Sequence, residues 1–434
     1  MEIGLLLAEE KYSEVWDKCS NGTSFVDLDA SFIASFYLNR DKSEEYANKI
    51  LEQAQKSPEF ARQLRQHFSR VERNLSKVHT QREVSILCFA NAVVGTWDPD
   101  SVTSGISGSE EAVIYLAQEL AKKYRVTVYA NPPEKSLYRL SSSNPQYKPV
   151  SQYFSDENCS TCILWRQTDF LAAKKKASKV LFWPHDVCTS TFPTEGCDGV
   201  LWLSSEQKKQ YVEKNSPLEK LPSVLCGNGI SLSQFSREKK GGLHKIVRKN
   251  PFSCIYASNY ARGLSLLIEI WPQIRKKFPR ATLDVYYGWQ TWGCLNQSEI
   301  IELKKKVEEC RKLGVTEHGK VGHEELARAF GKSSLWTYPC TAYETFCITA
   351  TKAQAAGCIP VVILDSALVE TVEPSAPSVP LDSDSKKNYL QLLLQTMERI
   401  SNSSDHLEKE RQLYSNFASN WSWENCALKV ETLF

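Results

Sequence analysis

A strong excess of charge of either sign is absent from this sequence. Its 53 lysine and arginine residues nearly balance 51 aspartate and glutamate residues, which leaves a net charge of +2 at pH 7. Proteins that bind nucleic acid or membrane surfaces through phosphates carry a basic excess or patch. We therefore expect no nucleic-acid partner.

Long apolar runs are also missing. No stretch approaches the roughly 18 apolar residues that a membrane-spanning helix needs. The N-terminal stretch MEIGLLLAEEKYSEV has acidic residues where a secretory signal has basic ones, and its apolar run is too short. We therefore expect no transmembrane segment and a cytoplasmic protein, with peripheral attachment to a membrane left open.

The 14 cysteines lack the pattern of a disulfide framework or a zinc site. They are scattered along a chain long enough to form a large core, whereas disulfide frameworks are typical of short secreted chains. The pair Cys159-x-x-Cys162 has no partner pair at zinc-finger spacing. We expect these thiols to be reduced and mostly buried.

Residues 1–82 have a helical pattern without intervening strands. Ser43 is a suitable N-cap for a helix, and residues 58–77 place their apolar side chains on one helical face. No clean repeat of about 34 residues is present. We predict a helical extension that acts either as a stabilising cap or as a docking site for a protein partner.

From residue 83 onward, short apolar segments alternate with amphipathic helical ones, which is typical of a parallel sheet with crossover helices. Strands are expected at 84–90, 126–129, 162–165, 179–183 and 199–203, and again at 252–257, 281–287, 334–338 and 359–363. The polar stretch 231–250 has the composition of a linker. The fold class is predicted as α/β, with two doubly wound halves facing a ligand cleft at the carboxyl ends of their strands.

Two loops are expected at this cleft. Gly105 and Gly108 follow the first strand, where glycine lets the backbone approach a ligand closely, although a tight turn explains them equally well. Arg262 follows the strand 252–257 and opens a helix. A guanidinium at that place can pair with phosphate, or it can simply be solvated.

A third segment, residues 338–361, is the most informative. Glu344 lies in the loop after the strand 334–338, where ligands bind. The next helix begins near Phe346, Cys347 and Ile348 and is closed by Gly357. The free N–H groups at its start are suited to a diphosphate.

This segment, YPCTAYETFCITATKAQAAGCIPV, resembles the retaining glycosyltransferases of family 4. Their motif is a glutamate, seven residues and a second glutamate, followed by Gly-x-Pro-Val. The resemblance covers about residues 84–434 and includes SGSEEA at 107–112, GHEELA at 322–327 and WSWE at 421–424. It is closest to a subgroup that carries helical N-terminal extensions.

The resemblance implies the glycosyltransferase-B fold, with two Rossmann-like domains around a cleft. The domains expected are a helical extension (1–82), an acceptor domain (83–227), a nucleotide-sugar donor domain (228–405) and a C-terminal helix that crosses back to the first domain (406–434).

The same resemblance implies roles for individual residues. His185 corresponds to a histidine near the reacting sugar, although a lone histidine beside Trp183 also suits a core position. Glu344 corresponds to the first motif glutamate, which faces the transferred sugar, and Arg262 to the cation on the donor diphosphate. The catalytic residues expected are His185 and Glu344, and the donor-binding residues expected are Gly105, Gly108, Arg262, Val321, Gly322, Thr345, Phe346, Cys347, Ile348 and Lys352.

Two departures from the family pattern affect this site. The second motif glutamate, which holds the nucleotide ribose in the family, is replaced by Lys352, and lysine offers only hydrogen-bond donors. The first cation of the family's phosphate pair is also missing, because Ala257–Asn259 occupy its place. Either the ribose is held differently, or the donor is unusual, or the site is degenerate.

The resulting functional prediction is the transfer of a hexose from a nucleotide diphosphate sugar to a hydroxyl acceptor, with retention of anomeric configuration. The nucleotide is expected to be UDP or GDP, the acceptor is a carbohydrate, glycolipid or protein that the sequence does not identify, and no cofactor is expected. No Asp-x-Asp metal motif is evident in either cleft loop, so the reaction is expected to be metal-independent. The alternatives are a non-catalytic sugar-nucleotide-binding scaffold and a sugar-nucleotide epimerase of the same architecture.

Overall fold

The computed structural model describes residues 17–18, 49–50, 52, 56–57, 82–89, 95–141, 143–156, 158–235, 250–290, 294–402 and 404–434. The chain divides into two units, Met1–Gln81 and Arg82–Phe434. The predicted N-cap at Ser43, the helix at 58–77 and a docking surface on these helices lie outside the described residues. No described helix is long and apolar enough to cross a membrane.

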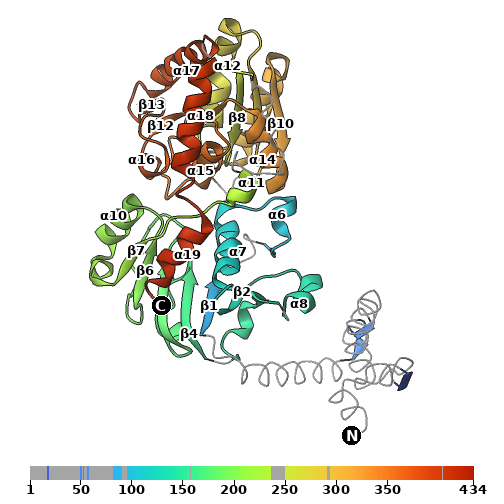
Figure 1. Cartoon of the computed structure of the whole chain (residues 1–434), viewed down its shortest axis with the longest axis vertical. Coiled ribbons are helices and arrows are strands. Elements are labelled where there is room, and N and C mark those ends of the chain that lie inside the picture. Colours follow the sequence, from blue (N-terminus) through green and yellow to red (C-terminus); the bar gives the residue numbers. More distant parts are fainter. Residues whose placement is uncertain are drawn as a thin grey trace. The chain divides into compact units, whose positions relative to one another are not determined.

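The second unit is built on two parallel sheets, shown in Figure 1. The seven-stranded sheet has the order β3-β2-β1-β4-β5-β6-β7, and the six-stranded sheet has the order β10-β9-β8-β11-β12-β13. The strands of the first sheet are β1 Glu83–Cys88, β2 Arg125–Ala130, β3 Gln146–Pro149, β4 Cys159–Trp165, β5 Ala177–Trp183, β6 Gly199–Trp202 and β7 Ser223–Leu225. Those of the second are β8 Ser253–Ala257, β9 Thr282–Tyr286, β10 Val315–Gly319, β11 Leu335–Tyr338, β12 Ile359–Leu364 and β13 Ser378–Pro380.

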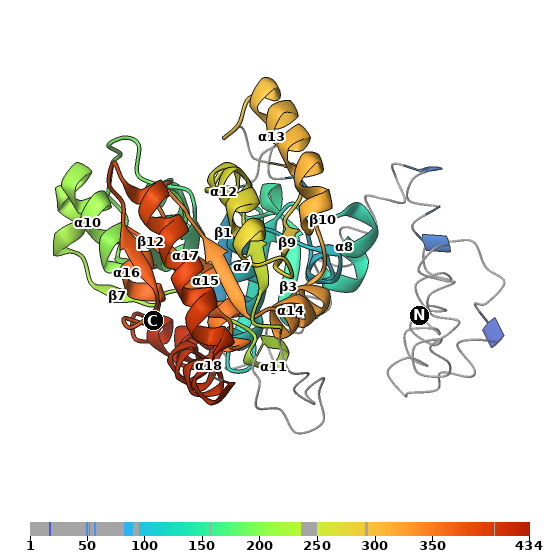
Figure 2. The same cartoon turned by 90° about the horizontal axis from the view of Figure 1, so that it is seen from above.

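Crossover helices connect these strands, as the alternating pattern predicts. In the first half they are α6 Ser101–Ser104, α7 Gly108–Leu120, α8 Glu134–Ser141, α9 Phe170–Lys174 and α10 Ser205–Lys214. In the second half they are α11 Leu232–Phe235, α12 Leu264–Lys277, α13 Gln297–Glu309, α14 His323–Lys332, α15 Ile348–Ala355 and α16 Leu368–Thr371, and α17 Ser385–Ser401 follows the last strand. Helices α12 and α17 lie side by side against the second sheet (Figure 2).

The central strands are buried on both faces, which is why their sequences are continuous apolar runs. Every residue of β8 and of β11 is buried, and so is every residue of β6. The predicted α/β class with two doubly wound halves is therefore confirmed. We call the part built on β1–β7 the first half and the part built on β8–β13 the second half.

The C-terminal segment serves both halves. Helix α18 (Ser404–Ala418) packs on α15 of the second half, and α19 (Trp423–Glu431) packs on α7 of the first half (Figure 1). Between them, the Trp421 carbonyl accepts a hydrogen bond from the Ile230 N–H at 2.7 Å. The two chain segments that connect the halves, one at Ile230 and one at Trp421, are therefore hydrogen-bonded to each other.

The described cysteines are mostly buried, as expected. Every described cysteine is a free thiol, and all except Cys294 are buried. The linker predicted at 231–250 is wrong over its first residues, because Leu232–Phe235 form α11, which packs on α14 and α15. The buried ring of Phe235 anchors this turn in the core of the second half, so polar composition alone was misleading here.

Candidate functional site

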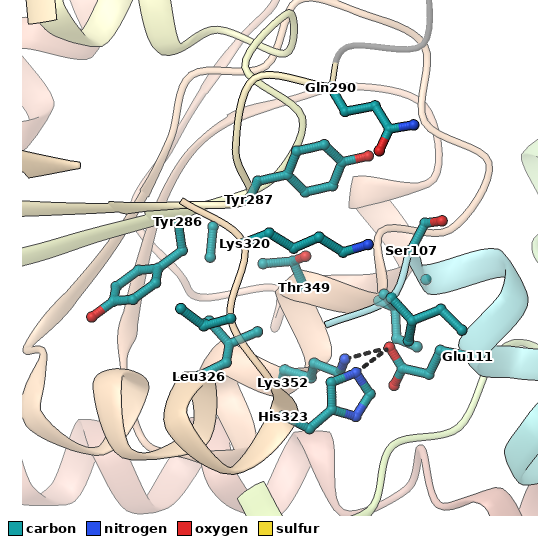
Figure 3. A pocket seen from close by; sticks show the side chains of 15 residues that line it. Ser107, Glu111, Tyr286, Tyr287, Gln290, Lys320, His323, Leu326, Thr349 and Lys352 are labelled. Atoms are coloured by element: carbon teal, nitrogen blue, oxygen red, sulfur yellow. Dashed lines mark hydrogen bonds and ion pairs between the residues drawn. The ribbon is translucent and has the colours of Figure 1, made fainter. Parts of the chain in front are cut away.

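A pocket lies between the two halves, at the ends of strands and the starts of helices. From the second half, Ala257 and Tyr286 end β8 and β9, and residues at the starts of α14 and α15 form further walls. The first half contributes the start of α7. The pocket residues, most of them labelled in Figure 3, are Ile106, Ser107, Gly108, Glu111, Ala257, Tyr286, Tyr287, Gln290, Lys320, Val321, His323, Leu326, Ile348, Thr349 and Lys352.

Backbone segments of the two halves meet closely beside this pocket. A Cβ atom on Gly322 would lie 2.0 Å from the Thr103 carbonyl oxygen, and one on Gly105 would lie 2.6 Å from the Val321 carbonyl oxygen. A Cβ on Gly108 would lie 2.8 Å from the Ile348 side chain. The predicted donor-binding glycines therefore allow the halves to approach, and of these only Gly108 lines the pocket.

The volume of the pocket is about 90 Å³. Small-molecule sites typically have volumes of roughly 300–1,000 Å³. The pocket as seen here is therefore smaller than a typical small-molecule site.

A buried charge cluster at the base of the pocket joins the halves (Figure 3). Lys352 of α15 donates to Glu111 Oε2 of α7 at 2.6 Å, and His323 Nε2 of α14 lies 3.2 Å from the same oxygen. Glu111, His323 and Lys352 are only 1–3% exposed. Lys352 is thus neither solvated nor unpaired: its charge is neutralised by a carboxylate from the opposite half.

The network continues from His323 to the first half. The Tyr115 hydroxyl lies 3.2 Å from His323 Nδ1, and the two rings stack at 6.0 Å between centroids. The same hydroxyl donates to Gln234 Oε1 at 3.4 Å. Because Glu111 and Tyr115 are four residues apart on α7, they lie on one face of that helix. Glu111 and His323 lie in the segments SGSEEA and GHEELA of the family resemblance, but neither residue had a predicted role.

Ionisation of Glu111 links the stability of the fold to pH. Burial opposes the charge, but Lys352 and then His323 outweigh it and lower the pKa of Glu111 from 4.5 to about 2. A carboxyl group whose pKa is lower in the folded state stabilises the fold above its unfolded pKa, and this contribution is lost as the pH falls through the folded pKa. We therefore expect the contribution of Glu111 to disappear between about pH 4.5 and pH 2.

Urea unfolding of the wild type and of Glu111→Gln, measured at several pH values in and above this window, checks the prediction. The wild-type advantage in free energy of unfolding should narrow as the pH falls, because protonation makes the two side chains alike in charge. A difference that stays constant across the window would mean that Glu111 is not ionised in the folded protein.

Arg262 and Glu344, predicted to act on the diphosphate and the sugar, bind each other. Arg262 NH1 lies 2.6 Å from Glu344 Oε2, and the other carboxylate oxygen accepts from the Tyr338 hydroxyl. Burial opposes the charge of Arg262, but Glu344 outweighs it and raises the pKa of the guanidinium. The Ser366 hydroxyl accepts from the Glu344 N–H at 2.9 Å. Neither Arg262 nor Glu344 lines the pocket described above.

His185 lies in an aromatic environment at the end of β5. Its ring centroid is 4.5 Å from that of Trp183 and 5.9 Å from that of Trp165, and its Nε2 atom is buried without a hydrogen-bond partner. Burial, together with the positive charge of Arg166, lowers its pKa well below 6.5. The imidazole is therefore neutral at physiological pH, and it does not line the pocket.

The residues just before α15 differ in what they contact. The Phe346 ring is buried against Trp421, Cys347 is buried with a φ of 55°, and the Thr345 carbonyl accepts from Ser204 of the first half at 2.8 Å. Among the described residues, the N–H groups of Phe346 and Cys347 meet no acceptor. The next residue, Ile348, lines the pocket. The two N–H groups without acceptors therefore directly precede a pocket-lining residue in the sequence.

Lys320, which sequence reasoning did not single out, is a further cation at the pocket. Its side chain extends into the pocket with the ammonium group directed toward Ser107 (Figure 3). Val321, predicted to be a donor-binding residue, lines the pocket beside it. Within the described residues, Lys320 makes no ion pair. The described part of the chain also contains no group of three or more His, Cys, Asp or Glu side chains that could hold a metal ion.

Two parallel, doubly wound sheets around a shared pocket define the glycosyltransferase-B fold, the fold that the sequence resemblance implied. Solved structures that share it include sucrose-phosphate synthase from Thermosynechococcus elongatus, with a TM-score of 0.60 and 16% identity over 81% of this chain and 98% of that one. Anabaena HepE in complex with UDP-glucose has a TM-score of 0.60 and 13% identity over 81% and 99% of the two chains. A glycosyltransferase from Rickettsia africae has a TM-score of 0.63 and 12% identity over 82% and 98%. No protein-family model matches the sequence, and a search of curated proteins finds no match.

Proposed function

We propose that this protein is a retaining glycosyltransferase that moves a hexose from a nucleotide diphosphate sugar, with UDP or GDP as the nucleotide, to a hydroxyl acceptor. The observation that carries the proposal is the pocket between the halves, because it lies at the carboxyl ends of β8 and β9 and at the starts of α7, α14 and α15. Ligands of open α/β sheets bind at such strand ends. The acceptor would be a carbohydrate, a glycolipid or a protein.

The groups around the pocket suit a diphosphate leaving group. The unbonded N–H groups of Phe346 and Cys347 precede α15, and the ammonium group of Lys320 lies in the pocket. Helix starts and cations stabilise the negative charge that develops on a leaving phosphate. We propose that they do so here without a divalent metal ion.

Arg262 can take part although it is paired. A guanidinium has five N–H donors, and the contacts of Arg262 with Glu344 and with the Tyr343 carbonyl both use NH1. We propose that Arg262 binds the diphosphate with its remaining donors and that its ion pair orients Glu344 toward the transferred sugar. His185 would act as a neutral group on the acceptor side.

Isothermal titration with UDP, GDP and ADP and with their sugar conjugates, in Mg²⁺ and in EDTA, tests this proposal. We expect one nucleotide to bind with equal affinity in both buffers, and the matching sugar nucleotide to support transfer with retained configuration by NMR. Binding to none of them would overturn the proposal in favour of the scaffold alternative. Conversion of the sugar without an acceptor would identify an epimerase.

Replacing Lys320 with glutamine is expected to weaken binding of the selected nucleoside diphosphate about tenfold, the cost of losing a charged hydrogen-bond donor. Lys312→Gln is the matched control, because Lys312 precedes β10 at its amino end, whereas Lys320 follows β10 at the pocket. Titration of both variants measures the effect. Equal affinities in the two variants would remove Lys320 from the phosphate site.

A further inference from the structure

Glu111 has one carboxylate oxygen that the protein leaves unused. Oε2 accepts a hydrogen bond from Lys352 Nζ at 2.6 Å and lies 3.2 Å from His323 Nε2. Oε1 is buried and has no hydrogen-bond partner. An ionised carboxylate offers about four acceptor sites. Leaving a buried acceptor unpaired is costly, so an oxygen of this kind at the wall of a pocket indicates a missing donor.

The position of Glu111 relates to the departure at Lys352. At the position on α15 where the family that the sequence resembles has a glutamate, this chain has Lys352. The carboxylate in the pocket comes instead from α7 of the opposite half. Lys352 Nζ also lies 5.1 Å from the centre of the Phe235 ring, so the ammonium group is enclosed on several sides. Lys352 therefore holds Glu111 in place through Oε2 and leaves Oε1 for another group.

The chemistry of that other group is restricted. A phosphate would be repelled by the negative carboxylate, and an apolar group would leave Oε1 unsatisfied. A hydroxyl is a small neutral donor, and a nucleotide sugar carries hydroxyls on its ribose and on its hexose. None of the pocket hydroxyls supplies the bond: Ser107 donates to Glu110 instead, and no bond joins Thr349 to Glu111.

We propose that Glu111 Oε1 accepts a hydrogen bond from a hydroxyl of the bound nucleotide sugar, and that Lys352 is the positioning residue for this carboxylate. The inference rests on the proposed function. It assigns to the first half a contact with the donor, so the bound sugar nucleotide bridges both halves. The carboxylate missing from α15 is thereby replaced from across the cleft.

The test compares, on two forms of the protein, nucleotides that lack one ribose hydroxyl and a nucleotide that carries the hexose. The full chain and Glu111→Gln are titrated with UDP, 2′-deoxy-UDP, 3′-deoxy-UDP and UDP-glucose, or with the guanosine series if GDP is the nucleotide that binds. We expect the wild type to lose about 10-fold to 100-fold in affinity when the contacting hydroxyl is removed, and Glu111→Gln to lose most of this discrimination. A ribose contact shows in the deoxy nucleotides, and a hexose contact in the difference between UDP and UDP-glucose.

A merely structural role for Glu111 would lower the melting temperature of Glu111→Gln without changing its discrimination between ligands. If Glu111→Gln does not fold, Glu111→Leu combined with Lys352→Met carries the same test, since it removes both buried charges together. Equal discrimination by both proteins, or none in the wild type, would overturn the inference while the proposed function stands. Failure of every nucleotide to bind the wild type would overturn both.

Discussion

Lys352→Met is expected to lower the free energy of unfolding by about 3–5 kcal/mol, the typical cost of removing one partner from a buried ion pair. The cause is the charge that remains. Glu111 is 1% exposed, and without the ammonium group its Oε2 atom would keep only His323, at 3.2 Å. Methionine fills a similar volume, so a cavity does not explain the loss. Urea unfolding followed by circular dichroism measures it.

Two control variants separate charge from packing in this prediction. Adding Glu111→Leu to Lys352→Met should recover much of the lost stability, because replacing both members of a buried pair by apolar residues is often neutral. Lys306→Met removes the ammonium group from an exposed pair with Glu302 of α13 and should change little. A small loss for Lys352→Met itself would contradict the buried-charge argument.

The sequence predicted the interior strands of both sheets but missed every edge strand. The missed strands are β3 and β7 in the first sheet and β10 and β13 in the second. Interior strands are buried on both faces and are therefore apolar runs, whereas edge strands are short and partly exposed. In β10, VTEHG, only Val315 is buried, so no apolar run marks the strand.

The site could be predicted only to the extent that its parts are local. The sequence identified Lys352 as a departure from the family pattern, because the spacing of seven residues between the two motif glutamates fixes that position along the chain. It could not pair Lys352 with Glu111, which lies 241 residues earlier and on the other half. The signal for Glu111 was its place in SGSEEA, the segment that forms the first turn of α7. Pairing it with Lys352 requires the approach of the two halves, which only the folded chain provides.

Gly322→Val is expected to lower the rate of the proposed glycosyl transfer about 100-fold while leaving each half folded. Gly322 precedes α14 with a φ of −71° and a ψ of 165°, which a β-branched residue adopts readily, so the backbone is not strained. The obstacle is the opposite half, since the new Cβ would lie 2.0 Å from the carbonyl oxygen of Thr103. That atom belongs to the backbone and has no flexible side chain to move. The halves would have to stay apart, and misplacing reacting groups by about 1 Å costs about 100-fold in rate.

Gly331→Ala, within the helix α14 that Gly322 precedes, is the matched control. A Cβ atom there meets nothing within 4 Å, and alanine within a helix is more favourable than glycine by roughly 0.5–1 kcal/mol, so this variant should keep full turnover and unfold no earlier than the wild type. Small-angle scattering, with and without the nucleotide sugar, reports the separation of the halves. If Gly322→Val kept normal turnover, the contact between Gly322 and Thr103 would not belong to the reactive arrangement. Glu111 would then have to reach the donor from a first half placed differently from the one seen here.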